Sequence, residues 1–535
     1  MTDVFRESSV LDSIELYDTT LRDGAQMWGI NFSVEDKLRI TRKLDELGVD
    51  FIEGGYPGSN PKDRRFFSIA KDLRLEHSQL VAFGSTCRAD IPPAEDPQTR
   101  SLLDSGTDVV SIVGKSWDLH VLEILAVPLE RNLSIIAESL SFLRPHFSKV
   151  FFDAEHFFDG FKTNPEYAMA TLGAAVSGGA DLLVLCDTNG GTLPSELVSI
   201  IRKVMEHIAV PLGIHAHNDS ETAVASTIAA VEAGVMHVQG TINGIGERCG
   251  NANLISVIPA LALKMNRLHY GHNRLRLLKH VSEFVDEMAN RTPLKFQPYV
   301  GSAAFAHKGG LHANAVIKNR IAYEHIDPTM VGNNRRFPMS EQAGRAALVQ
   351  KAGQFGIYLK ADDPSIGEIL KTIKDLEARG AHYEIADGSF ELLMKRMMGL
   401  HKRFFTLHGF HVSNVKRQGD TKTFSDAVIR IVVGDKMEFS AAEGNGPVNA
   451  LDTAFRNALI AFYPCVSEVR LTDFKVRVLE GASGTGATVR VLIESTDGDQ
   501  VWWTVGFNEN IIQASWDALV DSIDYKLQKD LAGDT

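Results

Sequence analysis

The chain has 535 residues, more than a single hydrophobic core usually organises, so we expect two or three domains. Its 68 acidic and 55 basic side chains give a formal net charge of −13, which argues against nucleic acid as the main partner. No apolar run reaches the about 18 residues that cross a bilayer, and the first ten residues lack the apolar core of a signal peptide, so we expect a cytoplasmic protein without membrane contacts. The four cysteines form no CxxC pair, so we expect neither a disulfide framework nor a structural zinc site.

The first half of the chain alternates apolar, strand-like runs with amphipathic, helix-like stretches. The first run, 14–18, precedes a helix that we expect to begin after Ser33, where Ser33 and Asp36 form a capping-box pattern, and to end at Gly48. Seven further strand-like runs follow at 49–55, 80–86, 108–114, 149–157, 181–188, 211–219 and 235–244. Eight strands alternating with helices over roughly 250 residues predict a (β/α)8 TIM barrel. A doubly wound open sheet is the less favoured alternative, because no GxGxxG follows the first strand.

Two more regions follow the predicted barrel. We expect a catalytic barrel at 1–275, helical linker subdomains at 276–422 and a small α+β domain at 423–535. The polar stretch 415–426 has the composition of a linker. In the last region a strand pattern followed by a helix pattern occurs twice, which indicates a duplicated unit.

Polar residues gather where the predicted barrel strands end, the face that carries active sites in TIM barrels. His215 and His217 are two residues apart on one strand, so their imidazoles project to the same face and could bind one divalent ion. Asp23 could add a carboxylate oxygen and Asn251 a carbonyl oxygen. This mixed set suits Mg, Mn, Co or Zn. The alternative is a chance pair of histidines with one buried ring.

Other polar residues at these strand ends also allow two interpretations. Arg22 could hold the keto oxygen of a 2-oxo acid, or it could form only a structural ion pair with Asp23. Glu155 and Thr188 could bind substrate through hydrogen bonds, or they could cap strand ends. We expect Glu247 to order the loop after the last strand.

Together these motifs resemble the DRE-TIM metallolyase superfamily, and within it the acyl-CoA-condensing branch of 2-isopropylmalate, homocitrate and citramalate synthases. The matching segments are DTTLRDGAQ (18–26), HAHND (215–219), NGIGERCGNAN (243–253), HKGGLHANAV (307–316) and YEHIDPTMVGN (323–333). The last region resembles the regulatory, dimer-forming domain of isopropylmalate synthases, so the likeness spans about 12–530. The resemblance implies an acyltransferase that uses acetyl-CoA and assembles as a homodimer.

The resemblance also implies a metal centre. Asp23, His215, His217 and Asn251 match the family's metal ligands, with Mg or Mn as the ion and Zn as an alternative. Arg22 matches the arginine that polarises the keto group and binds the substrate.

The remaining matches concern the two substrates. Gln26 and Thr188 fall at substrate-binding positions, and Glu155 at a catalytic position in contact with substrate. His312 and Tyr323 match catalytic residues that the neighbouring subunit contributes to acetyl-CoA activation.

Two segments, GGYPGSNPKD (54–63) and FDAEHFFDG (152–160), depart from the isopropylmalate pattern and resemble a citramalate synthase subgroup. This resemblance implies pyruvate as the acceptor, (R)-citramalate as the product, and a place in threonine-independent isoleucine biosynthesis. It also implies isoleucine as an effector that binds near 444–449 and its partner repeat, and the alternative is a last domain that only holds the dimer together. The alternatives are 2-oxoisovalerate or 2-oxoglutarate as the acceptor, a carbon-carbon lyase like HMG-CoA lyase, and a non-catalytic metabolite sensor.

Overall fold

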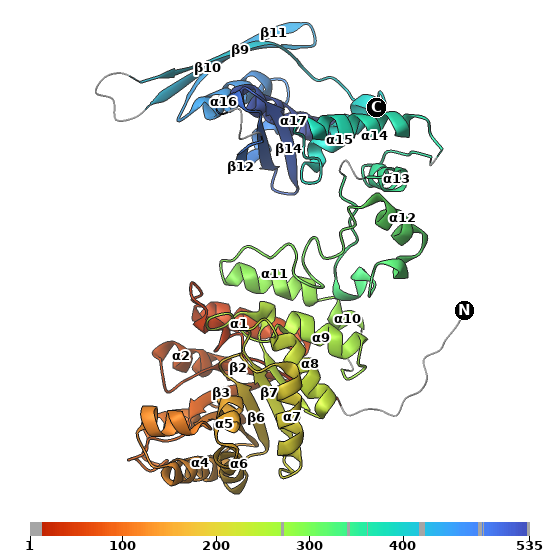
Figure 1. Ribbon diagram of the computed structural model, residues 1–535. Coiled ribbons are helices and arrows are strands. Elements are labelled where there is room, and N and C mark those ends of the chain that lie inside the picture. Colours follow the sequence, from red (N-terminus) through yellow and green to blue (C-terminus); the bar gives the residue numbers. More distant parts are fainter. Residues whose placement is uncertain are drawn as a thin grey trace. The chain divides into compact units, whose positions relative to one another are not determined.

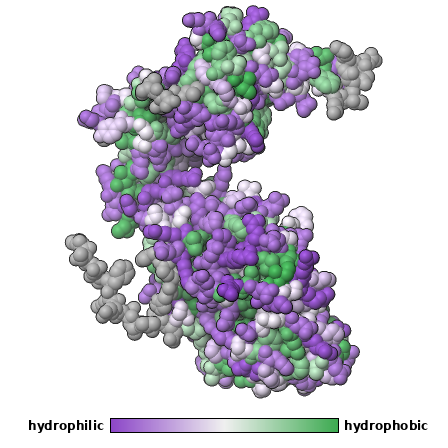
Figure 2. Space-filling view, turned by 180° about the vertical axis from the view of Figure 1, so that it is seen from behind, coloured by the Kyte–Doolittle hydropathy of each residue, from purple (hydrophilic) through white to green (hydrophobic). Residues whose placement is uncertain are grey.

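The computed structural model describes residues 13–531 except 269–271, 340–342, 361, 417–422, 480–483 and 485. It divides into two compact units, Met1–Phe305 with Ile326–Asn334, and Ala306–His325 with Arg335–Thr535 (Figure 1). On the face seen in Figure 2, hydrophilic residues predominate and hydrophobic residues form scattered patches. Within the described ranges, no helix is long and apolar enough to span a bilayer.

The first unit is a closed barrel of eight parallel strands (Figure 1). The strands are β1 (Glu15–Asp18), β2 (Phe51–Gly55), β3 (Gln79–Ser85), β4 (Val109–Lys115), β5 (Lys149–Glu155), β6 (Leu182–Asp187), β7 (Leu212–Ala216) and β8 (His237–Gly240). Each strand pairs with the next, and β1 pairs with β8 in the register Glu15↔His237, which closes the sheet. The predicted TIM barrel is therefore confirmed, and the open sheet is excluded.

Helices connect and surround these strands. They are α1 (Val34–Leu47), α2 (Pro61–Ala70), α3 (Pro97–Leu103), α4 (Leu129–Leu143), α5 (Phe157–Thr163), α6 (Pro165–Ser177), α7 (Pro194–Met205), α8 (Ala223–Ala233), α9 (Leu254–Leu263), α10 (His272–Leu275) and α11 (Leu278–Met288), with a π-helical turn at His120–Leu125. The capping box predicted for α1 is present, because Ser33 Oγ accepts from Asp36 N (3.1 Å) and Asp36 Oδ2 accepts from Ser33 N (2.9 Å). Gly48 ends α1 with φ +88°, which a residue with a Cβ rarely adopts.

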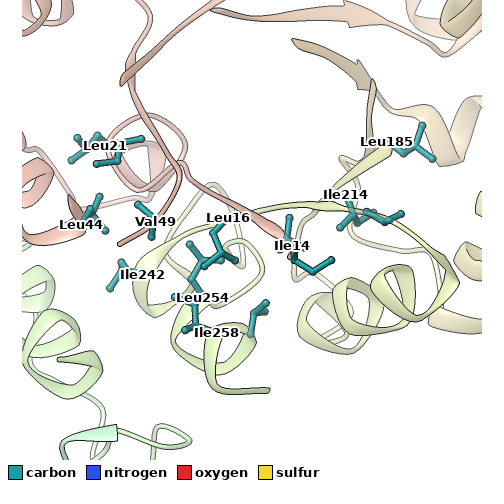
Figure 3. Packing of buried hydrophobic residues seen from close by; sticks show 14 of the residues in the cluster. Ile14, Leu16, Leu21, Leu44, Val49, Leu185, Ile214, Ile242, Leu254 and Ile258 are labelled. Carbon is teal, nitrogen blue, oxygen red and sulfur yellow. The ribbon is translucent and has the colours of Figure 1, made fainter. Parts of the chain in front are cut away.

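The main core of this unit lies between the barrel and its helices. Figure 3 shows Leu16 of β1, Leu44 of α1, and Leu254 and Ile258 of α9, all fully buried members of one cluster. Burying each such side chain contributes roughly 1.5–3 kcal/mol. The apolar residues whose pattern predicted these strands and helices are therefore the ones whose burial holds the elements together.

Aromatic rings fill the barrel interior toward the N-terminal ends of the strands. This aromatic floor consists of Tyr17, Phe51, Phe151 and His237, all buried. Phe51 and Phe151 meet edge to face with centroids 5.2 Å apart, and the His237 ring lies 5.3 Å from Phe151. The barrel is thus a packed core at this end, and its polar residues lie toward the other.

The second unit begins with helices and ends with two similar sheets. The helices are α12 (Gly310–Lys318), α13 (Arg345–Gln354), α14 (Ser365–Ala378) and α15 (Asp387–Met397). The first antiparallel sheet contains β9 (Thr406–Val415), β10 (Phe424–Val433) and β11 (Lys436–Gly444), followed by α16 (Pro447–Ile460). The second contains β12 (Arg470–Val478), β13 (Val489–Thr496) and β14 (Val501–Asn508), followed by α17 (Ile511–Leu531). The predicted α+β fold with a repeated strands-then-helix unit is confirmed.

One expectation for this unit needs correction. The stretch 415–426, interpreted as a linker, connects β9 to β10, and these two strands pair with each other. The sheet therefore starts at Thr406. Strand β9 escaped notice because it is largely exposed, so its sequence shows little apolar alternation. Residues 417–422 of this stretch lie outside the described residues.

Candidate metal centre and active site

Three of the four predicted metal ligands meet at the C-terminal ends of the barrel strands. Asp23 follows β1, while His215 and His217 lie at and just after the end of β7. The Oδ2 atom of Asp23 lies 3.7 Å from His215 Nε2 and 3.9 Å from His217 Nε2, and the two Nε2 atoms are 3.4 Å apart. All three side chains are buried, and their donor atoms lie within 4.8 Å of one another.

The fourth predicted ligand, Asn251, joins the same cluster from the loop after β8. Its Nδ2 donates to Asp23 Oδ1 (3.0 Å) and to the carbonyl oxygen of Ile245 (3.2 Å). Its Oδ1 is buried, and no donor among the described residues contacts it. Buried carbonyl oxygens normally have a partner. Two imidazoles, a carboxylate and this free oxygen therefore fit a divalent cation.

The electrostatics of the cluster match that donor set. Burial lowers the pKa of both imidazoles, that of His217 to about 4, so both rings are neutral near pH 7. Burial alone would raise the pKa of Asp23, but the Arg22 guanidinium and the hydrogen bond from Asn251 hold it below its usual range. Neutral imidazoles and an ionised carboxylate are the states in which these groups bind metals.

Arg22 lies beside the cluster and is held by two carboxylates. Its Nη1 donates to Asp23 Oδ2 (3.0 Å) and its Nε to Glu53 Oε2 (2.7 Å). Glu53 is fully buried in the middle of β2 and also accepts from the hydroxyls of Tyr17 (2.7 Å) and Thr19. Glu53 is not among the site residues predicted from the sequence. Its signal is an acidic residue inside the apolar run DFIEGG.

A cavity of about 230 Å³ opens next to Arg22. Its lining includes Arg22 and Gln26, both predicted to bind substrate, and the rings of Tyr56 and Phe83. The Arg22 guanidinium lies 4.0 Å from the centroid of the Phe83 ring, which fixes the plane of the cation. This cavity is large enough for a small organic acid.

A larger cavity, of about 450 Å³, lies at the ends of β3 to β5. Glu155 lines it and forms an ion pair with Lys115. Lys115 is not among the predicted site residues, because the predicted strand ended one residue before it. Thr188, directly after β6, accepts from the backbone N–H of His156 at 2.8 Å. Its hydroxyl hydrogen therefore remains available for a substrate oxygen.

Arg248 ties together the loops that follow β6, β7 and β8. Its guanidinium donates to both carboxylate oxygens of Asp219 (2.8 Å each) and to the carbonyl oxygen of Thr188 (2.6 Å). Glu247 is exposed and approaches Arg248 only to 4.0 Å. The ordering role that we expected of Glu247 thus falls to its neighbour, because only Arg248 reaches the other loops.

His312 and Tyr323 lie in the second unit. Their rings stack with centroids 4.2 Å apart and an interplanar angle of 23°. Both side chains are exposed, Tyr323 to 50%. The neighbouring Glu324 is buried and accepts from His307 (3.0 Å) and Arg335 Nε (2.6 Å), which anchors the segment that carries Tyr323. The structure thus presents these two predicted residues as one surface pair.

Comparison with known protein families agrees with this architecture. The HMGL-like family matches residues 13–285, which include the barrel and the metal cluster. The homocitrate synthase post-HMGL domain-like family matches 299–381, and the LeuA allosteric (dimerisation) domain matches 384–527. The domains match in the order that the sequence motifs implied.

Curated relatives narrow the family further. The chain is 54% identical to the (R)-citramalate synthase of Geobacter sulfurreducens, over 96% of this chain and 98% of that protein. It is 52% identical to the (R)-citramalate synthase of Aquifex aeolicus, over 97% and 98%. Identity to the 2-isopropylmalate synthase of Methanocaldococcus jannaschii is 29%, over 97% and 96%. The chain therefore belongs to the HMGL-like family and, within it, to the group of (R)-citramalate synthases.

Proposed function

We propose that this chain condenses acetyl-CoA with pyruvate and hydrolyses the resulting thioester, releasing (R)-citramalate and CoA for threonine-independent isoleucine biosynthesis. The observation that carries the proposal is that Arg22 and the two histidines all approach the carboxylate of Asp23 at the C-terminal ends of the barrel strands. Five proteins named (R)-citramalate synthase are 46–54% identical to the chain, against 29–30% for three named as established or probable 2-isopropylmalate synthases. This difference favours pyruvate over 2-oxoisovalerate.

In this proposal Asp23, His215, His217 and Asn251 hold a divalent cation. The oxygen and nitrogen donors suit Mg or Mn, with Zn as the alternative. When bound, the cation supplies Lewis acidity that polarises the keto group of the acceptor.

Arg22 stabilises the negative charge that develops on the keto oxygen. Burial would lower the pKa of Arg22, but Glu53 and Asp23 raise it above its usual value, so the guanidinium stays charged. The same two carboxylates fix its position, and a fixed cation needs no reorganisation when charge develops. Gln26 and the hydroxyl of Thr188 orient the acceptor by hydrogen bonds.

The condensation requires that the acetyl methyl group lose one proton. We place Glu155 and the pair His312–Tyr323 around that methyl group, where they direct the proton to a base. The methyl carbon then bonds to C2 of pyruvate, and the keto oxygen takes up a proton. Water finally cleaves the thioester to give the carboxylate and CoA.

We propose that His312 and Tyr323 act on the active site of the partner subunit in a homodimer. Mixing Asp23→Ala and His312→Ala chains tests this. Each mixed dimer would contain one complete site, so random exchange should restore about a quarter of wild-type activity. If the two residues act within their own chain, the mixture stays inactive.

We also propose that isoleucine inhibits the enzyme by binding at 444–449, which spans the end of β11, a two-residue connection and the first residues of α16. There the backbone N–H of Asn445 donates to Asn449 Oδ1 at 3.2 Å, which fixes the loop just before α16 begins. Isoleucine should inhibit the wild type, and Asn449→Ala should weaken that inhibition while leaving turnover intact. Activity that does not respond to isoleucine would mean that this domain serves dimerisation alone.

The overall function is tested by CoA release. Purified protein is supplied with acetyl-CoA and pyruvate, 2-oxobutyrate, 2-oxoisovalerate or 2-oxoglutarate, before and after chelator treatment and with Mg, Mn or Zn restored. We expect release that depends on pyruvate and on the added cation. Preference for another acid would refute the proposed acceptor, and release that resists chelation would refute the metal centre.

A further inference from the structure

Two buried side chains connect His215 to the interior of the barrel. Gln239 lies on β8, directly opposite His215 in the strand register, and its Oε1 accepts from His215 Nδ1 at 2.9 Å. Its Nε2 donates to Asp153 Oδ1 at 3.4 Å. Asp153 lies on β5, and both side chains are buried. Neither residue is among the site residues predicted from the sequence.

This chain of contacts determines which nitrogen of His215 carries the proton. A neutral imidazole has one N–H, and the amide oxygen of Gln239 draws it to Nδ1. Nε2 then keeps its lone pair and faces the Nε2 of His217 and the carboxylate of Asp23. If the amide were turned over, its NH2 would face Nδ1, the proton would move to Nε2, and that nitrogen could not bind a cation.

Asp153 distinguishes the two orientations of the amide. A carboxylate accepts hydrogen bonds, so it favours the orientation in which Gln239 Nε2 faces it. Burial and the nearby Glu53 raise the pKa of Asp153 to about 7. A cation bound a few side chains away favours its ionised, accepting form.

We propose that Asp153 is a positioning residue which, through Gln239, holds His215 in the tautomer that binds a divalent cation. The inference rests on the proposed metal centre and extends it to a second layer of residues. Such outer partners of metal-binding histidines commonly change metal affinity by 10- to 100-fold.

Calorimetric titration of the chelator-treated, full-length protein with Mn2+ tests this. We expect Asp153→Ala to weaken Mn2+ binding by about 10- to 100-fold. The double variant Gln239→Glu/Asp153→Asn exchanges acid and amide. It gives His215 Nδ1–H a carboxylate acceptor and gives that carboxylate an amide donor, so affinity should return to within about threefold of wild type.

Asp45→Asn is the matched control, because Asp45 is also buried but accepts from the backbone of Glu76, His77 and Ser78. It should lower the melting temperature of the metal-free protein and leave Mn2+ affinity unchanged. Wild-type affinity in Asp153→Ala, or a folded double variant without recovered affinity, would overturn the inference. Should Asp153→Ala not fold, Asp153→Asn replaces it, because its amide can turn either end to Gln239 and should also weaken binding. A wild-type protein that binds no Mn2+ would overturn the metal centre itself.

Discussion

Replacing Glu53 by glutamine tests how the barrel holds a charged arginine next to the proposed metal centre. The change preserves shape but removes the negative charge 2.7 Å from Arg22 Nε. Glu53 also accepts from the hydroxyls of Tyr17 and Thr19, whereas a glutamine has only one acceptor oxygen for these three donors. We therefore expect both the stability of the first unit and turnover to fall.

The size of the effect follows from burial. Removing one partner of a buried ion pair costs about 3–5 kcal/mol. Arg22 keeps Asp23 as a second partner at 3.0 Å, so we expect a loss near the lower end, about 3 kcal/mol. Because the guanidinium loses its anchor, turnover should fall by about 100-fold.

Urea unfolding and CoA release measure these two effects. Glu138→Gln is the control, since Glu138 pairs with Arg131 at 2.9 Å but its side chain is 45% exposed. An exposed pair contributes at most about 1 kcal/mol, so this control should change stability little and turnover not at all. If Glu53→Gln retained wild-type stability and turnover, Glu53 would not be the residue that balances the charge of Arg22.

Three further results are expected. Gly246→Ala should weaken Mn2+ affinity at least about 10-fold in calorimetry, because Gly246 has φ +157° and the added methyl would lie 2.0 Å from Asn251 Nδ2. Gly191→Ala is the control: its methyl meets no atom within 4 Å, so this variant should bind Mn2+ normally. Ser33→Ala should cost about 1 kcal/mol in urea unfolding by removing the cap of α1, and an unchanged midpoint would contradict that role. Burial alone would raise the pKa of Asp45, but its backbone N–H donors outweigh burial and hold the pKa below 3.8. The stability that the ionised carboxylate contributes is therefore present above about pH 4 and is lost as the pH falls through the pKa of the folded state. Melting temperatures measured from pH 5 to 2 should therefore fall less steeply for Asp45→Asn than for the wild type.

The sequence predicted the features that depend on local pattern. Strand and helix periodicity revealed the barrel, and Ser33 and Gly48 marked both ends of α1 because capping is decided within a few residues. The two-residue spacing of His215 and His217 placed both rings on one face for the same reason. These inferences needed no knowledge of how distant segments pack.

The residues that support the site could not be predicted in this way. Strands β2 and β8 are buried on both faces, so their sequences do not show which side chains point into the barrel. The partners of Glu53 and Gln239 come from other strands and become neighbours only through the strand register. Pairing across a closed sheet is a long-range property, which a single sequence does not reveal.

The aromatic floor also has a kinetic consequence. Because rings fill one end of the barrel, we expect both the small acid and the thioester to enter from the other end, where the cavity beside Arg22 lies. We expect the bulky thioester to cover this cavity once it is bound, so the small acid has to bind first and CoA has to leave before the product. We therefore expect ordered kinetics in which pyruvate binds first, so that (R)-citramalate competes with pyruvate and not with acetyl-CoA. A barrel that is filled at one end would thus impose the order in which substrates bind and products leave.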